Sequence, residues 1–320
     1  MSSTREARAR WSGLDYGLVL PSISRLPFPL GQRLARSRGL MNARQGRDWA
    51  ELATGQSYIA QRTRHAYSQI WPDMDADELV KQRYATASLE ELEALWIANG
   101  RFAHRKLDLE PVRDLLSQRP PGRGLVVLTA HFDSFILGML GLGLCGATTH
   151  VMTSAVVEDE RVPPAVQAHF ARKYREAGRY LKGGGFWHVE TAGRRFHRAL
   201  QRGEVVVVVA DAPAAGPDAP GVWVPWFGAE RRLAEGALRL ARSTRSAMAA
   251  LLTVGAGGDA QHWLCHGPLN PWGLPNEAAN SGEAEYRALF GFMEGVIRAH
   301  PGRWWGAHLL HDCPVRHTAA

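Results

Sequence analysis

Apolar residues in the first part of the chain recur at helical spacing. Residues 57 to 71 (SYIAQRTRHAYSQIW) carry apolar side chains every three or four positions. Residues 72 to 97 (PDMDADELVKQRYATASLEELEALWI) open with an acidic segment typical of a helix start and continue as a long periodic run. The pattern predicts that residues 45 to 118 are mostly helical and that residues 1 to 118 form an N-terminal helical section.

The pattern changes after residue 118. The breaker cluster RPPGRG at 119 to 124 precedes an apolar run, LVVLTA, and a second run, VVVVVAD, ends at Asp211. Unbroken apolar runs are typical of strands buried on both faces. The segments between them alternate between helical and strand patterns, which predicts an α/β domain over residues 119 to 320 with a mostly parallel sheet flanked by helices. Later strands are expected in GVWVPWFG, AMAALLTVG and HWLCHGPL, and later helices in AEGALRLARSTRSA and EYRALFGFMEGVIRAH.

Charge and cysteine content narrow the function classes. The 320 residues include 38 Lys and Arg against 31 Asp and Glu, a net charge of +7, which favours anionic partners such as phospholipid surfaces, phosphate-bearing substrates or an acidic carrier protein. The sequence has no nucleic-acid recognition motif, and its aromatic residues lie in apolar runs, so no nucleic-acid partner is expected. Three widely spaced cysteines predict neither a disulfide framework nor a thiolate zinc site and favour a reducing compartment.

The N-terminal apolar segment, Leu14 to Leu30, is interrupted by polar residues and three prolines, so it is too broken to span a bilayer. It also lacks the apolar stretch and cleavage site of a signal peptide, which predicts a cytoplasmic location. Its apolar residues are flanked by arginines. Two interpretations stay open: the segment lies in a membrane interface with its arginines on anionic headgroups, or it packs on its own domain.

Two polar residues terminate the two most apolar strands. His131 follows LVVLTA and Asp211 ends VVVVVAD. Because ligands of open α/β sheets bind beyond the carboxyl ends of the strands, both side chains are expected near one pocket. Asp133 or Ser134 is expected to cap the next helix, which would leave backbone N–H groups at its start free to face an anion or a developing oxyanion.

Four motifs then follow one another in a recognisable order: GLVVLTAHF, RALQRGEVVVVVAD, GVWVPWFGAERRLAEGALRLARSTRSA and HPGRWWGAHLLH. Over residues 15 to 315 the chain resembles the lysophospholipid acyltransferase-like superfamily, in particular its branch of late acyltransferases of lipid A biosynthesis. The resemblance implies transfer of an acyl group from a carrier-protein or coenzyme A thioester to a hydroxyl or amine of a lipid or glycolipid acceptor. It also implies a peripheral position on the cytoplasmic face of the inner membrane and a reaction that needs no metal or bound cofactor.

The signature of that superfamily is a histidine followed five residues later by Asp or Glu. The resemblance makes His131 the general base and the carboxylate its orienting partner. Here the fifth residue is Ile136, so we predict that Asp133, two positions after His131, replaces the missing acid. The alternative is that Asp133 only caps the helix and that Asp211, otherwise a pocket residue, or a substrate group serves instead.

Other departures bear on the substrates. MTSAVVEDERVPP stands where relatives usually carry a Tyr-Arg-Pro stretch, and Glu190 stands near a position where relatives often carry arginine. These differences favour a changed donor or acceptor. Two alternative functions stay open: transfer of a small acyl or aminoacyl group to a glycan or natural-product amine, and a member of the superfamily that binds lipid or carrier protein without turnover.

Further candidates are weaker. Ser134 as a hydrolase nucleophile lacks a G-x-S-x-G elbow, so a place in the substrate site or a helix cap is favoured. His308 is expected in the pocket by resemblance rather than in a metal site with the nearby residues His311, Cys313 and His317. The glycines at 183 to 185 predict a flexible hinge. Arg198 belongs to a basic helix that is expected to meet a carrier protein or lipid headgroups, or to be simply a solvated face.

Overall fold

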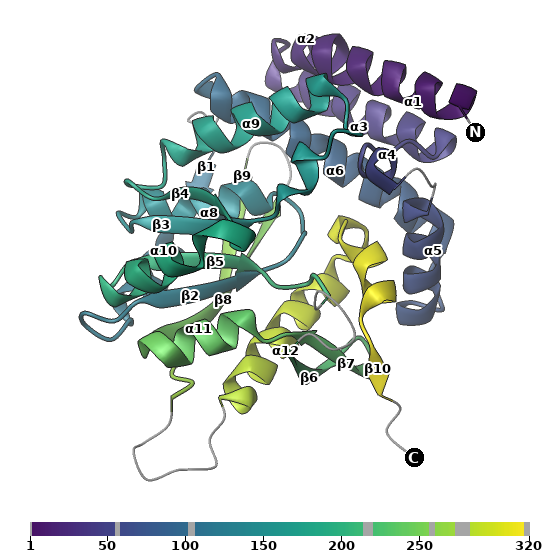
Figure 1. Cartoon of the computed structure of the whole chain (residues 1–320). Coiled ribbons are helices and arrows are strands. Elements are labelled where there is room, and N and C mark those ends of the chain that lie inside the picture. The colour runs from purple at the N-terminus through teal and green to yellow at the C-terminus, as the bar shows by residue number, and fades with distance from the viewer. Residues whose placement is uncertain are drawn as a thin grey trace.

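The computed structural model describes residues 2–54, 58–101, 106–213, 220–255, 260–272 and 282–316. Within these ranges the chain has three parts, which Figure 1 shows: a layer of N-terminal helices, a twisted central sheet between helices, and a small second sheet beside the C-terminal segment. The predicted α/β class with an N-terminal helical section is confirmed.

The central sheet has seven strands in the described part of the chain, in the order β1-β9-β8-β2-β5-β3-β4. All neighbouring pairs are parallel except β8 and β9. The central strands β2 and β5 are runs of β-branched and apolar residues, which suit a strand covered on both faces. The strands are β1 (Lys106–Asp108), β2 (Leu125–Thr129), β3 (Thr149–Thr153), β4 (Gly185–His188), β5 (Val205–Val209), β8 (Ala247–Gly255) and β9 (Ala260–Leu269).

Helices bury both faces of this sheet. One face packs on α7 (Glu110–Ser117), α8 (Phe135–Leu144) and α9 (Pro164–Gly178), and the other on α10 (Val189–Gln201), α11 (Gly236–Thr244) and α12 (Glu283–Ala299). Helix α8 lies unusually close to its neighbours because it is rich in glycine: a Cβ atom at Gly141 would lie 2.5 Å from the Trp263 indole nitrogen. The glycine-rich segment FILGMLGLGL therefore forms a buried helix.

The N-terminal layer consists of short and long helices that pack on one another. Helix α6 begins at its N-cap Asp75, whose side chain accepts hydrogen bonds from the N–H groups of Asp77 and Glu78, so the predicted acidic helix start is confirmed. The layer comprises α1 (Ser2–Leu14), the π-helix η1 (Asp15–Val19), α2 (Leu20–Ser24), α3 (Phe28–Gln45), α4 (Ala50–Thr54), α5 (Ile59–Ile70) and α6 (Ala76–Ala98).

Strand β1 lies before residue 118, within the section expected to be helical, and pairs with β9 at the edge of the central sheet. The two sections expected from the sequence, which we interpreted as one continuous structural unit, therefore share this sheet. Among the described residues, no helix is long and apolar enough to cross a membrane. The N-terminal helices do expose several large apolar side chains: Leu14, Leu18, Leu30 and Leu34.

Three regions differ from the sequence-based expectations. Strands β4 and β7 (Ala229–Ala234) were not predicted; β7 pairs with β6 (Gly221–Trp226) and β10 (Val315–Arg316) in the small sheet. In place of a flexible hinge, Gly184 packs so closely on β3 that a Cβ atom would collide with the Thr149 carbonyl group, and Gly185 begins β4. The residues after α12, for which no regular element was predicted, form two 3₁₀ helices, η4 (Pro301–Arg303) and η5 (Ala307–Asp312).

Candidate active site

The ends of β2 and β5 bring His131 and Asp211 together. The two strands are parallel neighbours whose last residues, Thr129 and Val209, lie opposite each other. His131 and Asp211 each lie two residues after the end of their strand. His131 Nδ1 lies 2.8 Å from Asp211 Oδ1, and the backbone N–H of His131 donates to Asp211 Oδ2 at 2.9 Å. Strand register therefore joins two residues that are 80 positions apart.

The surroundings of Asp211 favour its charged form. Its side chain is fully buried, and the indole Nε1 of Trp304 donates to Oδ2 at 2.9 Å. Burial by itself raises the pKa of Asp211, but the nearby His131 ring and the hydrogen bonds from His131 and Trp304 outweigh it, so the pKa lies below its usual value. An ionised Asp211 accepts a hydrogen bond from the protonated Nδ1 of His131. The proton of the neutral ring then lies on Nδ1, which leaves the lone pair of Nε2 available as a base.

Asp133 is not the partner of His131, which corrects the prediction from spacing. Its Oδ2 accepts from the backbone N–H of Gly255 at 3.0 Å and from Arg303 Nη1 at 2.7 Å. The reason is the backbone: β2 has already ended, and Asp133 adopts a left-handed conformation with φ of 44°. The rule that residues i and i+2 share a side holds only in a continuing strand, so it does not apply to this turn.

The helix start also differs from expectation. Ser134 occupies the N-cap position of α8, but no side chain caps that helix; the Ser134 carbonyl group instead accepts from the Thr253 hydroxyl at 2.9 Å. Ile136, the fifth residue after His131, is fully buried in the apolar core beneath the sheet. A carboxylate there would be desolvated, so Ile136 is a packing residue in this chain.

Residues 304 to 306, near the C-terminus, hold the backbone and ring of His131 in place, a role that the sequence did not predict. The backbone N–H groups of Trp305 and Gly306 donate to the His131 carbonyl group at 3.0 and 3.2 Å. The Trp305 and His131 rings contact each other edge to face, with 4.8 Å between their centroids. The Tyr67 hydroxyl donates to the Trp304 carbonyl group at 2.7 Å and ties this segment to α5. The density of aromatic residues in GRWWGAH was the available signal.

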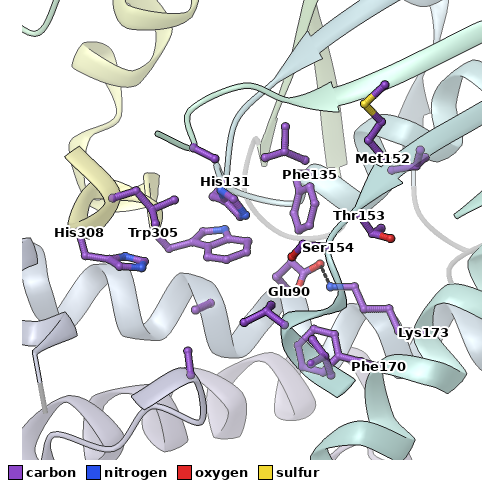
Figure 2. A pocket seen from close by; sticks show the side chains of 18 of the residues that line it. Glu90, His131, Phe135, Met152, Thr153, Ser154, Phe170, Lys173, Trp305 and His308 are labelled. Carbon is purple, nitrogen blue, oxygen red and sulfur yellow. Dashed lines mark hydrogen bonds and ion pairs between the residues drawn. The ribbon is translucent and has the colours of Figure 1, made fainter. Parts of the chain in front are cut away.

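A large cavity of about 910 Å³ opens beside His131. Figure 2 shows His308 and Trp305 on one side of His131, and Met152 and Thr153 on the other. We divide the lining into two parts by the elements that supply it, and call them the apolar arm and the polar arm. The apolar arm is lined from β3, β4, β5, α10 and α11, by residues that include Met152, Phe186, Phe196, Val208 and Leu240. The polar arm is lined from α1, α3, α6 and η5, by residues that include Trp11, Arg38, Asn42, Arg83, Tyr84 and His308.

A buried ion pair stands at the centre of the cavity wall. Lys173 of α9 donates to Glu90 of α6, and both side chains are almost completely buried (Figure 2). The Lys173 ammonium group also lies 5.1 Å from the Phe135 ring centroid and 5.3 Å from that of Phe170. Cation–π contacts and the carboxylate together offset part of the desolvation of the ammonium group. The pair therefore joins α6 to α9 in the wall of the cavity.

His308 lies in the cavity, as expected. Burial, and next the positive charge of Arg83, lower its pKa to about 3, so its imidazole is neutral near pH 7. Arg198, in contrast, is exposed on α10 and does not line the cavity. Among the described residues, no group of three His, Cys, Asp or Glu side chains is placed to hold a metal ion, and His317 lies outside those residues.

Comparison with protein-family models and with curated proteins returned no match for this chain. The fold and the site together define a class: an α/β protein in which a His–Asp pair lies at adjacent strand ends and its histidine lines a large cavity. Such a pair is suited to proton transfer on a bound substrate, because the carboxylate fixes the tautomer of the imidazole and stabilises its charged form.

Proposed function

We propose that this chain is an acyltransferase of the lysophospholipid acyltransferase-like superfamily, in a divergent position near the late acyltransferases of lipid A biosynthesis. It moves an acyl group from a carrier-protein or coenzyme A thioester to a hydroxyl or amine of a lipid or glycolipid acceptor. The observation that carries the proposal is the His131–Asp211 pair, which lies just beyond the carboxyl ends of β2 and β5, beside a cavity of about 910 Å³. The order of the sequence motifs supports the same conclusion.

In the proposed reaction, Nε2 of His131 takes the proton of the acceptor hydroxyl or amine as its oxygen or nitrogen attacks the thioester carbonyl carbon. The tetrahedral intermediate collapses by breaking the C–S bond, and the imidazolium returns its proton to the leaving thiolate. Asp211 stabilises the imidazolium throughout, because it is ionised and bonded to Nδ1. The products are the acylated acceptor and a free thiol.

The start of α8 is the candidate site for the developing oxyanion. The helix begins four residues after His131, and the backbone N–H groups of its first turn carry no side-chain cap. A helix N-terminus offers both N–H donors and a partial positive charge to an anion. Donors that are fixed before the reaction stabilise the oxyanion without further reorganisation.

The apolar arm is the candidate site for the acyl chain. Met152, Phe186, Val208 and Leu240 supply apolar surface from four separate elements of the fold. Burial of a hydrocarbon chain contributes about 0.8 kcal/mol per CH₂ group, so a longer chain should bind more tightly until the arm is filled. A small-acyl or aminoacyl donor would gain little from this arm.

The N-terminal layer is the candidate membrane surface. Leu14, Leu18, Leu30 and Leu34 are exposed, and arginines flank them in sequence. Apolar side chains that enter the acyl boundary, together with arginines on anionic headgroups, form the usual basis of peripheral binding. We propose that the protein binds peripherally to the cytoplasmic face of the bacterial inner membrane; the exposed leucines support surface binding, and the choice of membrane follows from the resemblance.

The test is a transfer assay with the purified chain, palmitoyl-coenzyme A and a bacterial extract of lipids and glycoconjugates, read by mass spectrometry. The proposal predicts an added palmitoyl mass on one acceptor and release of an equal amount of free thiol. His131→Ala should abolish both signals. If the wild-type protein, given coenzyme A and carrier-protein thioesters in turn, binds lipid or thioester but adds no acyl mass to any fraction, the binding-only function replaces this one.

A further inference from the structure

Helix α1 (Ser2–Leu14) differs from the other long helices of the described chain because it contributes nothing to the buried core. Every other described helix of eight or more residues buries at least one residue. None of the described side chains of α1, which are those of residues 6 to 14, is buried. Figure 1 shows α1 on the outside of the N-terminal layer. A segment with few buried apolar contacts opens at a low cost in free energy, independently of the rest of the fold.

The two faces of α1 meet different surroundings. Trp11 and Ser12 line the polar arm of the cavity from its inner face. Arg10 and Leu14 have the i, i+4 spacing of one helix face, and both are exposed, Leu14 to 48%. Helix α1 therefore lies between the cavity on one side and solvent on the other.

Contacts with the residues from 47 to 51 hold α1 over the cavity. The Arg47 guanidinium group lies 4.4 Å from the centroid of the Trp11 ring, and Arg8 Nη1 lies 3.6 Å from Glu51 Oε2. The Arg8 side chain is 30% exposed and Arg47 is half-buried, so neither contact has the strength of a desolvated pair. Helix α1 also lies against α9. These contacts fix the position of α1 only loosely.

The turn that follows α1 has the features of a hinge. It is the π-helix η1, in which the Leu20 N–H donates to the carbonyl group of Asp15, five residues earlier. A π turn is a usual site of bending in a helix. The turn itself is fixed to the layer, because the Asp15 carboxylate accepts from Arg38 Nε at 2.8 Å and both side chains are almost completely buried. The chain is therefore firmly attached after Leu14 and loosely attached before it.

The exposed surface on both sides of this hinge fits an anionic bilayer. Leu14 and Leu18 are exposed there. Four exposed arginines of the same layer have no carboxylate partner among the described residues: Arg10, Arg25, Arg33 and Arg36. Leucines that enter the acyl boundary and arginines on headgroups bind the outer face of α1 to a bilayer. A surface that binds α1 better in an open position than in the closed one shifts the population toward the open position.

We propose that α1 is a lid over the polar arm, hinged at η1, and that an anionic bilayer holds it open. In water the lid is closed, and the open state is a minor population of about 10% or less. At the bilayer, Arg10 and Leu14 bind the headgroups and the acyl boundary, and Trp11 leaves the cavity wall. A lipid acceptor then passes from the bilayer into the cavity without crossing water. The acceptor and the membrane surface rest on the proposed function, but movement of the lid requires neither a thioester nor His131.

The first experiment measures the position of α1 by pulsed electron–electron double resonance on the full chain. Spin labels are attached at Ala7→Cys on α1 and Ala171→Cys on α9, two exposed positions, with the three native cysteines replaced by alanine. Vesicles of phosphatidylglycerol and phosphatidylcholine should lengthen the distance between the labels, because α1 moves away from α9. Vesicles of phosphatidylcholine alone should leave the distance as it is in buffer. The control pair, Ser37→Cys on α3 with Ala171→Cys, should keep its distance under all three conditions.

Three outcomes would overturn the lid. The first is an unchanged distance between the labels at 7 and 171 on anionic vesicles that carry the protein, as shown by flotation. The second is an equal lengthening in the control pair, which would show that the whole layer moves and that η1 is not a hinge. The third is a protein that does not float with anionic vesicles, since the lid would then have no trigger.

The second experiment repeats the distance measurement on variants of α1. Trp11→Ala removes the ring beneath Arg47 and should populate the longer distance in buffer. Leu14→Ser should reduce the fraction of the longer distance on anionic vesicles about fivefold, whereas Leu144→Ser, which changes an exposed leucine of α8, should retain it. Trp11→Ala should also lower Tm much less than Trp96→Ala, because Trp96 is buried in the core. Equal lowering of Tm would show that α1 is a fixed part of the fold and would overturn the proposal.

These outcomes are separate from the fate of the proposed function. A distance that lengthens on anionic vesicles, without acyl transfer to any fraction, would leave the lid standing and remove the transferase. Acyl transfer by a protein in which the distance never changes would do the reverse.

Discussion

The turns that follow β2 and β5 each present an aspartate at the same edge of the sheet, but the two carboxylates do different things. Asp133 is two residues from His131 and is bonded to Arg303 and to the Gly255 backbone, at the end of β8. Asp211 is 80 residues away and is bonded to the histidine itself. Proximity in sequence therefore gave the wrong partner, and the register of parallel strands gave the right one.

The difference has a physical origin in how each turn leaves its strand. After β5 the hydrogen bonding between the two neighbouring segments continues: the Ala210 N–H donates to the Thr129 carbonyl group at 2.7 Å, and the His131 N–H donates to Asp211 Oδ2 at 2.9 Å, so Asp211 stays beside its neighbour across the sheet edge. After β2 the chain turns at Asp133 through a left-handed conformation and enters α8. The same turn that begins the helix therefore points the Asp133 carboxylate toward η4 and away from the imidazole.

The largest effect is expected at the histidine that both turns surround. His131→Ala should reduce acyl transfer by about a hundredfold to ten-thousandfold, because it removes the base. The measurement is the initial rate of thiol release in the presence of acceptor extract. His150→Ala is the matched control: His150 is likewise paired with a carboxylate, Glu204, at 2.8 Å, but it does not line the cavity. Equal losses in the two variants would contradict a specific role for His131.

The next effect is expected at the buried aspartate. Asp211→Asn should lower the rate of transfer by about a hundredfold or more, because the amide neither fixes the tautomer of His131 nor stabilises the imidazolium. The rate should be compared with that of Glu204→Gln, which makes the same chemical change beside His150. A rate for Asp211→Asn within threefold of wild type would mean that the pair is structural.

The third effect concerns two histidines, His308 and His169, for which no carboxylate partner is found in the part of the chain that the structure describes. His308 and His169 have pKa values lowered to about 3, chiefly by burial. Because the unfolded chain binds protons on these rings below about pH 6.5 and the folded chain does not, stability is lost as pH falls. When the pH falls from 7 to 5, each of these two histidines should lower the free energy of unfolding by about 2 kcal/mol. Urea unfolding at both pH values measures the loss.

The matched variants for that measurement are His308→Gln and His169→Gln. Each should remove about half of the pH-dependent loss, and the double variant should remove most of it. An unchanged slope in both single variants would show that other groups cause the acid sensitivity.

The smallest effect is expected at the nearer aspartate. Asp133→Asn should lower the free energy of unfolding by about 1 kcal/mol, since its ion pair with Arg303 is only partly buried. Transfer should remain within threefold of wild type. A double-mutant cycle with Arg303→Met isolates the coupling between the two side chains. A coupling near zero would show that the ion pair contributes nothing to the fold.

The sequence predicted well what depends on local pattern. The valine run of β5 and the apolar run of β2 were recognisable as buried strands, and the position of His131 after β2 placed it at the ligand edge of the sheet. Helix α6 was evident from its acidic start and its periodic apolar residues.

What the sequence left open depends on long-range packing. Whether Asp133 or Asp211 meets His131 is decided by which strands are neighbours, and alternation along the chain does not specify that order. The return of Trp304 to the site was also hidden, because the residues around it form 3₁₀ turns without a periodic pattern.

The most direct test of the His131–Asp211 assignment compares Asp211→Asn with Asp133→Asn in one transfer assay, with the same donor and extract. The account predicts that Asp211→Asn loses about a hundredfold or more in rate, whereas Asp133→Asn stays within threefold of wild type. A large loss in Asp133→Asn together with a nearly normal rate in Asp211→Asn would contradict it and return the role of partner to the aspartate beside the histidine in sequence.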